Sequence, residues 1–428
     1  MSRSFVMIFC GAFRSGGDAA FILPELPFWR KRGFRVVLFS ANKAENGLLP
    51  PDDNISLEEL EPPAVSFPAL LRTFFSLLAK RKFYRELLDI LRTSPRPKYV
   101  AVAVKKHLMG LAALRQLKNK LRELDIRRDD TVVLYSYWLE YFSLAAAECP
   151  VEADHVLRIA RAHEYDLYDN RPGNGYMPWK RARIDALDGV FPDSHHGTNY
   201  LRGRYPGLKE KIFCSHIGSV DFGLQPYRPD PELRIISCSH IVPVKRVALI
   251  IRALSQIRNV PVCWTHIGSG VCQKECQELA AEILPDNIRV VWAGACSHAE
   301  LKKVYQTQPF DLFVSLTSSE GIPVSMMESI SCGIPIIATA VCGVPEIVRP
   351  GQSGWLLPAD APEEAFRRAV SSYLEMTEPE RVRLRASCRK LWESDFDPAI
   401  NHERFLQRIF AMLNGTAAGT EGSLSETN

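Results

Sequence analysis

The chain has 428 residues, which is too long for one ordinary hydrophobic core and therefore favours two domains. Its composition is that of a globular protein, and its net charge is only +4. Its eleven cysteines form no C-x-x-C pair or zinc-ligand spacing, which argues against a disulfide scaffold and favours reduced thiols in the cytoplasm.

The first half of the chain alternates apolar runs with amphipathic stretches, which is typical of strands and helices wound as βα units. Residues 19–33 predict one helix that ends at Gly33. The predicted strands of this half are residues 4–11, 34–40, 131–136, 155–161 and 189–194.

A glycine-containing loop, FRSGGD at residues 13–18, joins the first strand to this helix. Gly16 and Gly17 allow backbone N–H groups to approach a phosphate near a helix N-terminus. A purely structural glycine turn fits the same residues. The G-x-G-x-x-G spacing of dinucleotide-binding proteins is absent, which disfavours an oxidoreductase.

A basic insertion at about residues 64–128 interrupts the βα pattern. Between Arg72 and Arg128 there are sixteen Lys and Arg against four Asp and Glu, so the rest of the chain is net negative. Apolar residues recur there at helical spacing, namely Leu70, Phe74, Leu77, Leu78 and Leu88. Residues 70–128 therefore predict basic amphipathic helices that bind an anionic membrane surface. The alternative is that the leucines pack on the first domain while the charges face water.

A second series of βα units follows the Pro-rich, polar stretch 223–233. Its predicted strands are residues 234–239, 262–270, 288–294, 311–316, 334–339 and 355–358. The fold class predicted is α/β, with two doubly wound Rossmann-like domains that face each other across a cleft. The predicted divisions are a first domain at 1–225, a second at 226–390, a helix at 391–412 that packs back on the first domain, and a disordered tail at 413–428.

Lys245 follows the strand at 234–239 and precedes a helix. A cation at that position can face a pyrophosphate, with the helix N-terminus adding its own positive end. A solvated basic helix start is the alternative. His240, five residues earlier, is a candidate for sharing this role or for satisfying the loop.

Two carboxylates frame a predicted strand-to-helix junction in SSEGIPVSMMESISCG at residues 318–333. Glu320 lies in the loop, and Glu328 lies just over two helical turns further on. The helix start, where free N–H groups can bind oxygen atoms, is surrounded by Gly321, Ile322, Pro323 and Val324. Carboxylates that accept hydroxyl groups beside amides that bind phosphate suit a nucleotide sugar. A helix carboxylate paired with a basic residue is the alternative for Glu328.

These stretches resemble the family 4 glycosyltransferases. Glu320 and Glu328 match the family's E-x7-E signature, and residues 333–348 and 351–358 are similar to its closing segment. SHIVPVKR is similar to its phosphate-binding segment, and HIGSG, which contains Gly268, to its second-domain loop. RAHEYDLYDNR resembles a segment of members that build cell-envelope polysaccharides. The resemblance is strong over residues 230–360 and does not cover the basic insertion.

The resemblance implies the two-Rossmann GT-B fold and a role for each matched residue. Glu320 is expected to contact the hydroxyls of the donor sugar and Glu328 the ribose hydroxyls. Lys245 is expected to neutralise the leaving diphosphate. His163 is expected to face the sugar and the acceptor, and the loop with Gly16 and Gly17 to close over the phosphates.

One residue departs from the family pattern. His240 stands where Arg is usual, which removes a fixed positive charge and affects phosphate affinity or nucleotide choice. Asp18 and Glu346 are further candidates for binding acceptor hydroxyls.

The activity implied is a retaining, metal-independent hexosyltransferase without a cofactor. Its donor is expected to be a UDP-sugar, or alternatively a GDP-sugar, and its acceptor a saccharide or a lipid-linked saccharide in cell-envelope polysaccharide biosynthesis. The alternatives are a sugar-nucleotide epimerase of the same fold and a non-catalytic nucleotide-sugar-binding protein. The expected location is the cytoplasm, peripherally on the inner face of the membrane. No nucleic-acid partner is expected, because no reader motif accompanies the basic region.

Overall fold

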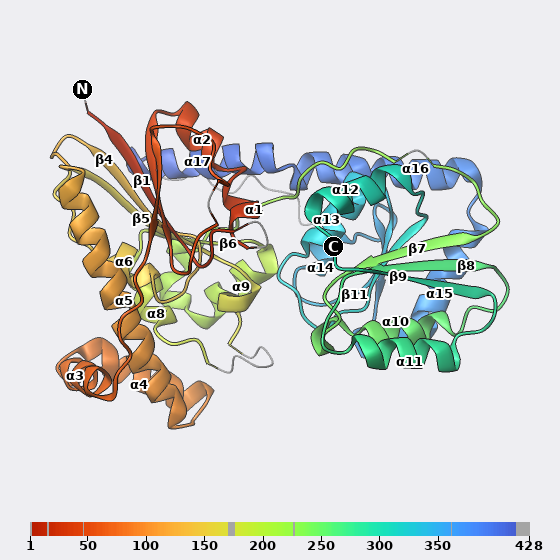
Figure 1. Cartoon of the computed structure of the whole chain (residues 1–428), viewed down its shortest axis with the longest axis horizontal. Coiled ribbons are helices and arrows are strands. Elements are labelled where there is room, and N and C mark those ends of the chain that lie inside the picture. The colour runs from red at the N-terminus through yellow and green to blue at the C-terminus, as the bar shows by residue number, and fades with distance from the viewer. Residues whose placement is uncertain are drawn as a thin grey trace. The chain divides into compact units, whose positions relative to one another are not determined.

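The computed structural model describes residues 2–14, 17–45, 47–169, 176–225, 227–360 and 362–416 (Figure 1). The chain forms two compact units. The first unit comprises the described residues within Met1–Asp193, Gly197–Ser215 and His402–Asn428, and the second comprises those within Ser194–His196 and His216–Asn401.

The first unit is built on a six-stranded sheet with strand order β3-β2-β1-β4-β5-β6, in which all pairs are parallel. Its strands are β1 (Ser4–Cys10), β2 (Phe34–Ser40), β3 (Ile55–Glu59), β4 (Thr131–Ser136), β5 (His155–Ala162) and β6 (Gly189–Pro192). Its helices are α1 (Ala19–Ile22), α2 (Leu26–Lys31), α3 (Phe67–Leu78), α4 (Arg81–Thr93), α5 (Lys98–Glu123), α6 (Ser143–Glu148), α7 (Glu164–Leu167), α8 (Lys180–Ala186) and the 3-10 helix η1 (Pro206–Lys211). The helix α9 (His195–Arg204) begins in the second unit and continues in the first.

Two elements of this unit differ from the sequence prediction. The single helix predicted at residues 19–33 is two short helices, because Pro24 lacks an N–H and disfavours helical conformation in the residue before it. The strand β3 was not predicted. It lies at the edge of the sheet and is only partly buried, so it lacks the apolar run that marks the other strands.

The second unit is also a six-stranded parallel sheet, with strand order β12-β11-β10-β7-β8-β9. Its strands are β7 (Leu233–Cys238), β8 (Val262–Ile267), β9 (Ile288–Gly294), β10 (Leu312–Ser315), β11 (Ile336–Thr339) and β12 (Gly354–Leu357). Its helices are the 3-10 helix η2 (Pro243–Lys245), α10 (Val247–Leu254), α11 (Gln273–Ile283), α12 (His298–Thr307), α13 (Val324–Ser331), α14 (Val344–Ile347), α15 (Pro362–Glu375), α16 (Glu378–Leu391) and the π-helix η3 (Trp392–Phe396).

Both faces of the second sheet are buried, which explains why its strands are continuous apolar runs. Ile235 and Val314 belong to the cluster that includes residues of α10, α11 and α15. Their neighbours Ile236 and Phe313 belong to the cluster that includes residues of α12, α13 and α16. Figure 1 shows helices on both faces of each sheet. The predicted fold class, two doubly wound parallel-sheet domains, is confirmed.

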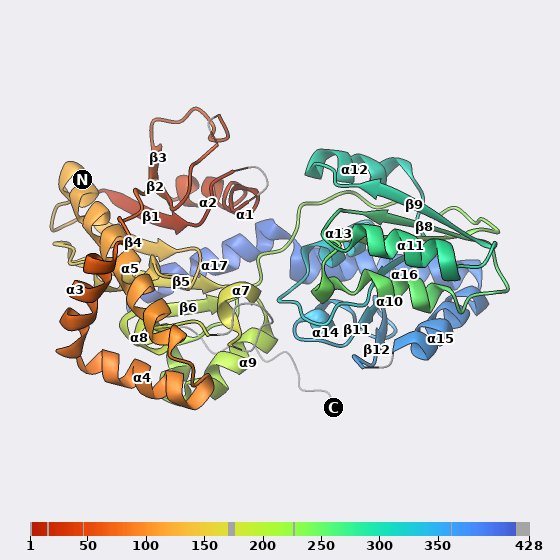
Figure 2. The same cartoon turned by 60° about the horizontal axis from the view of Figure 1, so that its bottom comes forward.

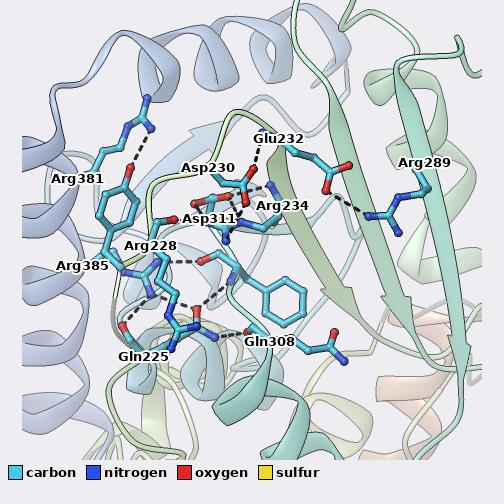
Figure 3. Close-up of polar contacts among 12 residues, drawn as sticks. Gln225, Arg228, Asp230, Glu232, Arg234, Arg289, Gln308, Asp311, Arg381 and Arg385 are labelled. Carbon is cyan, nitrogen blue, oxygen red and sulfur yellow. Dashed lines mark hydrogen bonds and ion pairs between the residues drawn. The ribbon is translucent and has the colours of Figure 1, made fainter.

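The segment predicted to join the two domains is bound to the second unit (Figure 3). The Arg234 guanidinium donates to both carboxylate oxygens of Asp311, at 2.9 and 3.0 Å. The buried Arg385 donates to the carbonyls of Phe310 and Gln225, at 2.9 and 3.1 Å. These bonds lie at the amino ends of β7 and β10 and hold these two strand ends together.

The last described helix, α17 (Pro398–Leu413), begins in the second unit and continues in the first from His402. It begins at Pro398, after the π-helix η3, so the predicted helix boundary at residue 391 falls at the end of α16. Phe405, Leu406 and Ile409 pack in the core with side chains of β1 and β4. Residues 417–428, most of the predicted tail, lie outside the described residues.

The basic insertion contains the helices α3, α4 and α5. Leu77, Phe83 and Ile90 are buried in one cluster with Val104 of α5 and Trp179, so this part of the insertion packs on the first unit. No helix in the described stretches of the chain is both long and apolar enough to cross a membrane.

A buried carboxylate anchors α4 to the chain before α8. Glu86 Oε1 accepts hydrogen bonds from Tyr176 Oη and from the Trp179 backbone N–H, each at 2.8 Å. Burial raises the pKa of Glu86 from 4.5 to about 7. Between pH 4.5 and about pH 7 the Glu86 carboxyl is ionised in the unfolded chain but still protonated in the folded protein. The free energy of unfolding therefore falls as the pH rises through this range.

Replacing Glu86 by Gln is therefore expected to reduce the loss of stability between pH 4.5 and pH 7 by roughly 3 kcal/mol, because the amide does not ionise. Thermal unfolding of both proteins across this range measures the difference. Glu123→Gln, at an exposed glutamate of α5, is the matched control. An unchanged pH dependence in Glu86→Gln would show that Glu86 is ionised in the folded protein.

Candidate functional site

Each sheet reverses its strand order next to its first strand. In the first unit β1 lies between β2 and β4, and in the second β7 lies between β8 and β10. Ligands of such sheets bind beyond the carboxyl ends of the strands at these reversal points. The loops after β1 and β4, and those after β7 and β10, are therefore the places to look for functional side chains.

Lys245 and Glu320 meet beyond the carboxyl ends of β7 and β10. Lys245 ends the 3-10 helix η2, and Glu320 lies in the loop between β10 and α13. Lys245 Nζ lies 2.5 Å from Glu320 Oε1, with the Glu320 side chain 8% exposed and that of Lys245 23% exposed. The fold thus brings together two residues that are 75 positions apart in the chain. They present a cation suited to phosphate oxygens and a carboxylate suited to hydroxyl groups at one point.

Hydrogen bonds lock the two loops that carry this ion pair. Ser318 N–H and Thr317 Oγ1 both donate to the Val244 carbonyl, at 2.9 and 3.0 Å. The Arg246 guanidinium donates to the carbonyls of Leu316 and Thr317, at 2.5 and 2.7 Å. Arg246, next to Lys245 in the sequence, therefore supports the loops rather than facing the ligand edge.

The start of α13 offers donors beside Glu320. Gly321 and Ile322 are buried, and Pro323 is the N-cap of α13. Within the described residues, the N–H groups of Gly321, Ile322 and Val324 have no backbone or side-chain acceptor. Buried N–H groups are nearly always paired, so this arrangement is suited to an anionic ligand that supplies the acceptors.

Glu328 lies in α13, where its carboxylate is buried. Its Oε1 is 2.8 Å from Nε2 of the half-exposed His298, the first residue of α12. Burial raises the pKa of the Glu328 carboxyl, and the bond to His298 lowers it in part. The same hydrogen bond raises the pKa of His298. The helix carboxylate is therefore paired, although with a histidine rather than with Lys or Arg.

His298 was not among the candidates found in the sequence. The S-H-A-E pattern at residues 297–300 forms a capping box at the start of α12, so the sequence does signal a helix there. Nothing in that pattern places the imidazole against a carboxylate 30 positions away.

Two other predicted donor-binding residues lie on neighbouring loops of the same edge. His240 is exposed on the loop after β7. Gly268 follows β8 and has φ +135°, and a Cβ there would lie 2.0 Å from the Ser239 carbonyl oxygen. Its N–H donates to the Gly294 carbonyl at 2.8 Å. Because Gly268 has no Cβ, the loop after β8 can lie in close contact with the loop after β7.

In the first unit, Asp18 fixes the loop that follows β1. Its Oδ2 accepts hydrogen bonds from the N–H groups of Gly11 and Ala12, at 2.5 and 3.2 Å, and from Trp138 Nε1 at 3.0 Å. Gly17 is packed closely, since a Cβ there would lie 2.7 Å from the Ala12 carbonyl oxygen. Gly16 lies outside the described residues. The helix that follows, α1, has only one turn and so offers little of a helix dipole.

His163 lies at the end of β5 and is buried. Its Nε2 is 3.1 Å from the Tyr137 carbonyl oxygen, and its Nδ1 is 3.3 Å from Asp193 Oδ2. A carbonyl oxygen only accepts, so Nε2 carries the proton. Its ring also packs against Trp138 at 4.7 Å between centroids. Both ring nitrogens are therefore positioned by groups of the first unit.

Asp166 joins the loops after β4 and β5. Its carboxylate accepts hydrogen bonds from the backbone N–H groups of His163 and Leu139, at 2.7 and 2.5 Å. Burial raises the pKa of Asp166 to about 7. Asp166 thus holds the backbone at His163 in place.

Glu346, another candidate from the sequence, is occupied within the second unit. It accepts hydrogen bonds from the N–H groups of His195 and His196 at 2.9 Å, and it lies 2.9 Å from His216 Nε2. These hydrogen bonds hold the pKa of Glu346 below its ordinary value against the opposing effect of burial.

Part of the chain, including this site, is similar to a known family. Residues 225–391 match the family model of the glycosyl transferases group 1. This range contains Lys245, Glu320, Glu328 and His298. The predicted resemblance to glycosyltransferases is therefore confirmed.

The chain is also similar to curated polysaccharide enzymes. It is 32% identical over 253 residues to the putative colanic acid biosynthesis glycosyltransferase WcaL of Escherichia coli, a match that covers 56% of this chain and 61% of the relative. It is 28% identical over 183 residues to the amylovoran biosynthesis glycosyltransferase AmsK of Erwinia amylovora, covering 41% and 44%. The chain thus spans less than two thirds of either relative.

Solved structures share the fold over nearly the whole chain. The Anabaena protein HepE, solved in complex with UDP, has a TM-score of 0.63 and 13% identity, with 96% of this chain and all of that chain covered. At this identity the likeness concerns the fold, which is the GT-B arrangement of two Rossmann-like domains.

Proposed function

We propose that this chain, whose residues 225–391 match the family model of the glycosyl transferases group 1, moves a sugar from a nucleotide-sugar donor to an acceptor with retention of anomeric configuration. The observation that carries the proposal is the Lys245–Glu320 pair beside the N–H groups at the start of α13, which have no acceptor among the described residues. A cation, a helix start and a carboxylate at one point suit a diphosphate joined to a sugar.

In the proposed reaction, the bond between the anomeric carbon and the diphosphate oxygen breaks first. Lys245 and the N–H groups of Gly321 and Ile322 stabilise the charge that develops on the departing oxygen. Glu320 holds the sugar hydroxyls, and Glu328 holds the ribose. The acceptor oxygen then bonds to the face that the diphosphate leaves, and its proton passes to the departing phosphate.

The donor proposed is a UDP-sugar, since the Anabaena neighbour with this fold is solved with UDP. The acceptor proposed is a saccharide or a lipid-linked saccharide of a cell-envelope polysaccharide, as the names of the two curated relatives suggest. The acceptor is bound by the first unit, where His163 and Asp18 are the candidate residues. The positive charge of Lys245 supports a metal-independent reaction.

A panel of UDP- and GDP-sugars, assayed by release of nucleoside diphosphate with and without a saccharide acceptor, tests the proposal. The expected result is acceptor-dependent release from one donor, undiminished by a chelator, with a product of retained configuration. Conversion of a donor to its epimer without acceptor would favour an epimerase. Binding of nucleotide with no release from any donor would favour a non-catalytic binding protein.

Replacing His298 by Ala is expected to shift the acid limb of kcat/KM for the donor to higher pH. Glu328 accepts ribose hydroxyl groups in its ionised form, so activity falls as the pH drops below the pKa of Glu328. His298 lowers that pKa, and without His298 the carboxylate protonates at a higher pH. The pH–rate profiles of the two proteins measure the shift.

His155→Ala, at an exposed histidine of β5, is the matched control and is expected to leave the profile unchanged. An acid limb of His298→Ala that stays in place or moves to lower pH would contradict the role assigned to Glu328.

A further inference from the structure

Large apolar side chains are exposed mainly on one part of the first unit. Eight of the fourteen exposed large apolar residues among the described residues lie between residues 65 and 91. Phe67, Phe75 and Leu91 are 76%, 60% and 64% exposed. Figure 2 shows the helices that carry them, α3 and α4, at the outer edge of the unit beside α5. Folded monomers rarely expose so many large apolar groups together unless they bind something there.

The exposed residues form one stripe on each helix. On α3 they recur at intervals of four, four and three residues, which places them on one face; they are Phe67, Leu71, Phe75 and Leu78. On α4 the stripe consists of Tyr84, Leu88 and Leu91. The core is packed by other residues, Leu77, Phe83 and Ile90. Both helices therefore carry a second apolar face in addition to the buried one.

The two stripes meet where α3 joins α4. Tyr84 Oη donates a hydrogen bond of 2.7 Å to the Leu78 carbonyl. The Phe75 ring packs on Phe74, at 5.9 Å between centroids, and Phe74 packs on Phe83 at 5.8 Å. Phe83 in turn stacks on the buried Trp179. The seven stripe residues, called the α3–α4 ridge from here on, are thus held on the rigid core of the unit.

Every exposed charged residue of α3 and α4 is an arginine; these are Arg72, Arg81, Arg85 and Arg92. The acidic residues of α4 lie inward, with Glu86 buried and Asp89 partly so. Lys82 is paired with Glu148. At helical spacing, Arg81, Arg85 and Arg92 form a stripe next to that of Tyr84, Leu88 and Leu91.

We propose that the α3–α4 ridge inserts into the headgroup region of an anionic lipid bilayer, with the flanking arginines on the lipid phosphates. Apolar and aromatic side chains beside a cationic stripe are the composition of helices that lie in a membrane interface, with the apolar face about 5–10 Å deep. A second copy of this chain is a poorer occupant, because a self-complementary interface over the ridge brings like-charged arginines together.

This inference deepens the proposed function, on which its purpose rests: a lipid-linked acceptor requires the first unit to work at a membrane surface. It also changes the residues that carry membrane contact. Of the five apolar residues that the sequence singled out, Leu70, Phe74 and Leu77 pack inward. The other two, Leu78 and Leu88, are exposed and belong to the ridge.

Flotation of the full chain with vesicles tests the inference. The wild type is expected to bind vesicles of phosphatidylcholine and phosphatidylglycerol, and to bind phosphatidylcholine alone at least tenfold more weakly. The variant Phe67→Ser, Phe75→Ser, Leu91→Ser is expected to lose at least tenfold in binding to the anionic vesicles. At about 1 M salt, where the Debye length is about 3 Å, the wild type is expected to retain more binding than this variant.

Val271→Ser, Val382→Ser, at exposed valines of the second unit, is the matched control and is expected to bind as the wild type does. Thermal unfolding of each variant verifies folding. Absence of wild-type binding to anionic vesicles, or unchanged binding of the ridge variant, overturns the inference. Self-association that depends on the ridge, without vesicle binding, also overturns it and assigns the ridge to a second copy.

The assay is independent of sugar transfer, because no nucleotide is present. Release of nucleoside diphosphate with a water-soluble saccharide acceptor is expected to be the same in the ridge variant and the wild type. A failure of the proposed function therefore appears in the turnover assay alone, and a failure of the membrane inference appears in the flotation assay alone.

Discussion

Replacing Glu320 by Gln is expected to lower kcat by roughly two to three orders of magnitude, the scale seen when one pre-positioned polar group is removed from an active site. Gln keeps the size of the side chain and one acceptor oxygen. It loses the negative charge that fixes the Lys245 ammonium 2.5 Å away and that accepts the donor hydroxyls. Initial rates of nucleoside diphosphate release from the accepted donor measure the effect.

Glu282→Gln, at an exposed glutamate of α11, is the matched control and is expected to keep the wild-type rate. Because Glu320 lies in a loop, the unfolding temperature of Glu320→Gln is expected to stay close to that of the wild type. Near-wild-type turnover in a folded Glu320→Gln protein would remove Glu320 from the catalytic assignment.

Replacing Lys245 by Met is expected to weaken binding of nucleoside diphosphate by roughly 10- to 100-fold, which corresponds to the 1.5–3 kcal/mol of a hydrogen bond to a charged group. The rate of transfer is expected to fall as well, since the same charge stabilises the departing diphosphate. Met keeps the length and the apolar stem of the side chain, so the change removes mainly the ammonium. Isothermal titration calorimetry with the nucleoside diphosphate measures the affinity.

Lys245→Arg keeps the charge and is expected to recover part of the lost affinity, which distinguishes a loss of charge from a loss of structure. Lys274→Met, at an exposed lysine of α11, is the matched control. Unchanged affinity in Lys245→Met would mean that the ammonium serves only to pair with Glu320.

The Glu320→Gln and Lys245→Met variants also distinguish the role of each partner in this ion pair. In the protein without ligand, Lys245 and Glu320 neutralise each other in a poorly exposed position. A nucleotide-sugar donor offers phosphates to Lys245 and hydroxyl groups to Glu320. The pair is therefore expected to hold the donor without leaving a buried charge unpaired.

Much of the fold was predictable from the sequence because its strands are buried on both faces. Ile235 and Ile236 face opposite helical layers, so both must be apolar, and such runs separated by helices are typical of doubly wound sheets. The position of the site follows from the same pattern, since Lys245 and Glu320 each follow a strand and precede a helix. The edge strand β3 escaped prediction because its residues are only partly buried.

Contacts between distant residues depended on the tertiary structure. The sequence places Glu328 on a helix, but only the packing of α12 beside α13 puts His298 against it. Asp18 and His163 were candidates by position. In the structure Asp18 Oδ2 accepts from the backbone and from Trp138, and the ring nitrogens of His163 lie against Tyr137 and Asp193. Whether a polar side chain already has hydrogen-bond partners depends on the groups that the fold places around it. Those groups come from distant parts of the chain, so the local sequence does not reveal them.

That the insertion is helical, basic and apolar could be predicted from the sequence, because helical spacing is a local property of the chain. It did not determine which apolar stripe is buried. The helix α3 carries apolar side chains on more than one face, so Leu77 and Phe75 are equivalent candidates for the core until α5 and Trp179 occupy one side. Packing excludes water from the first stripe and leaves the second exposed, and only the tertiary structure made that choice.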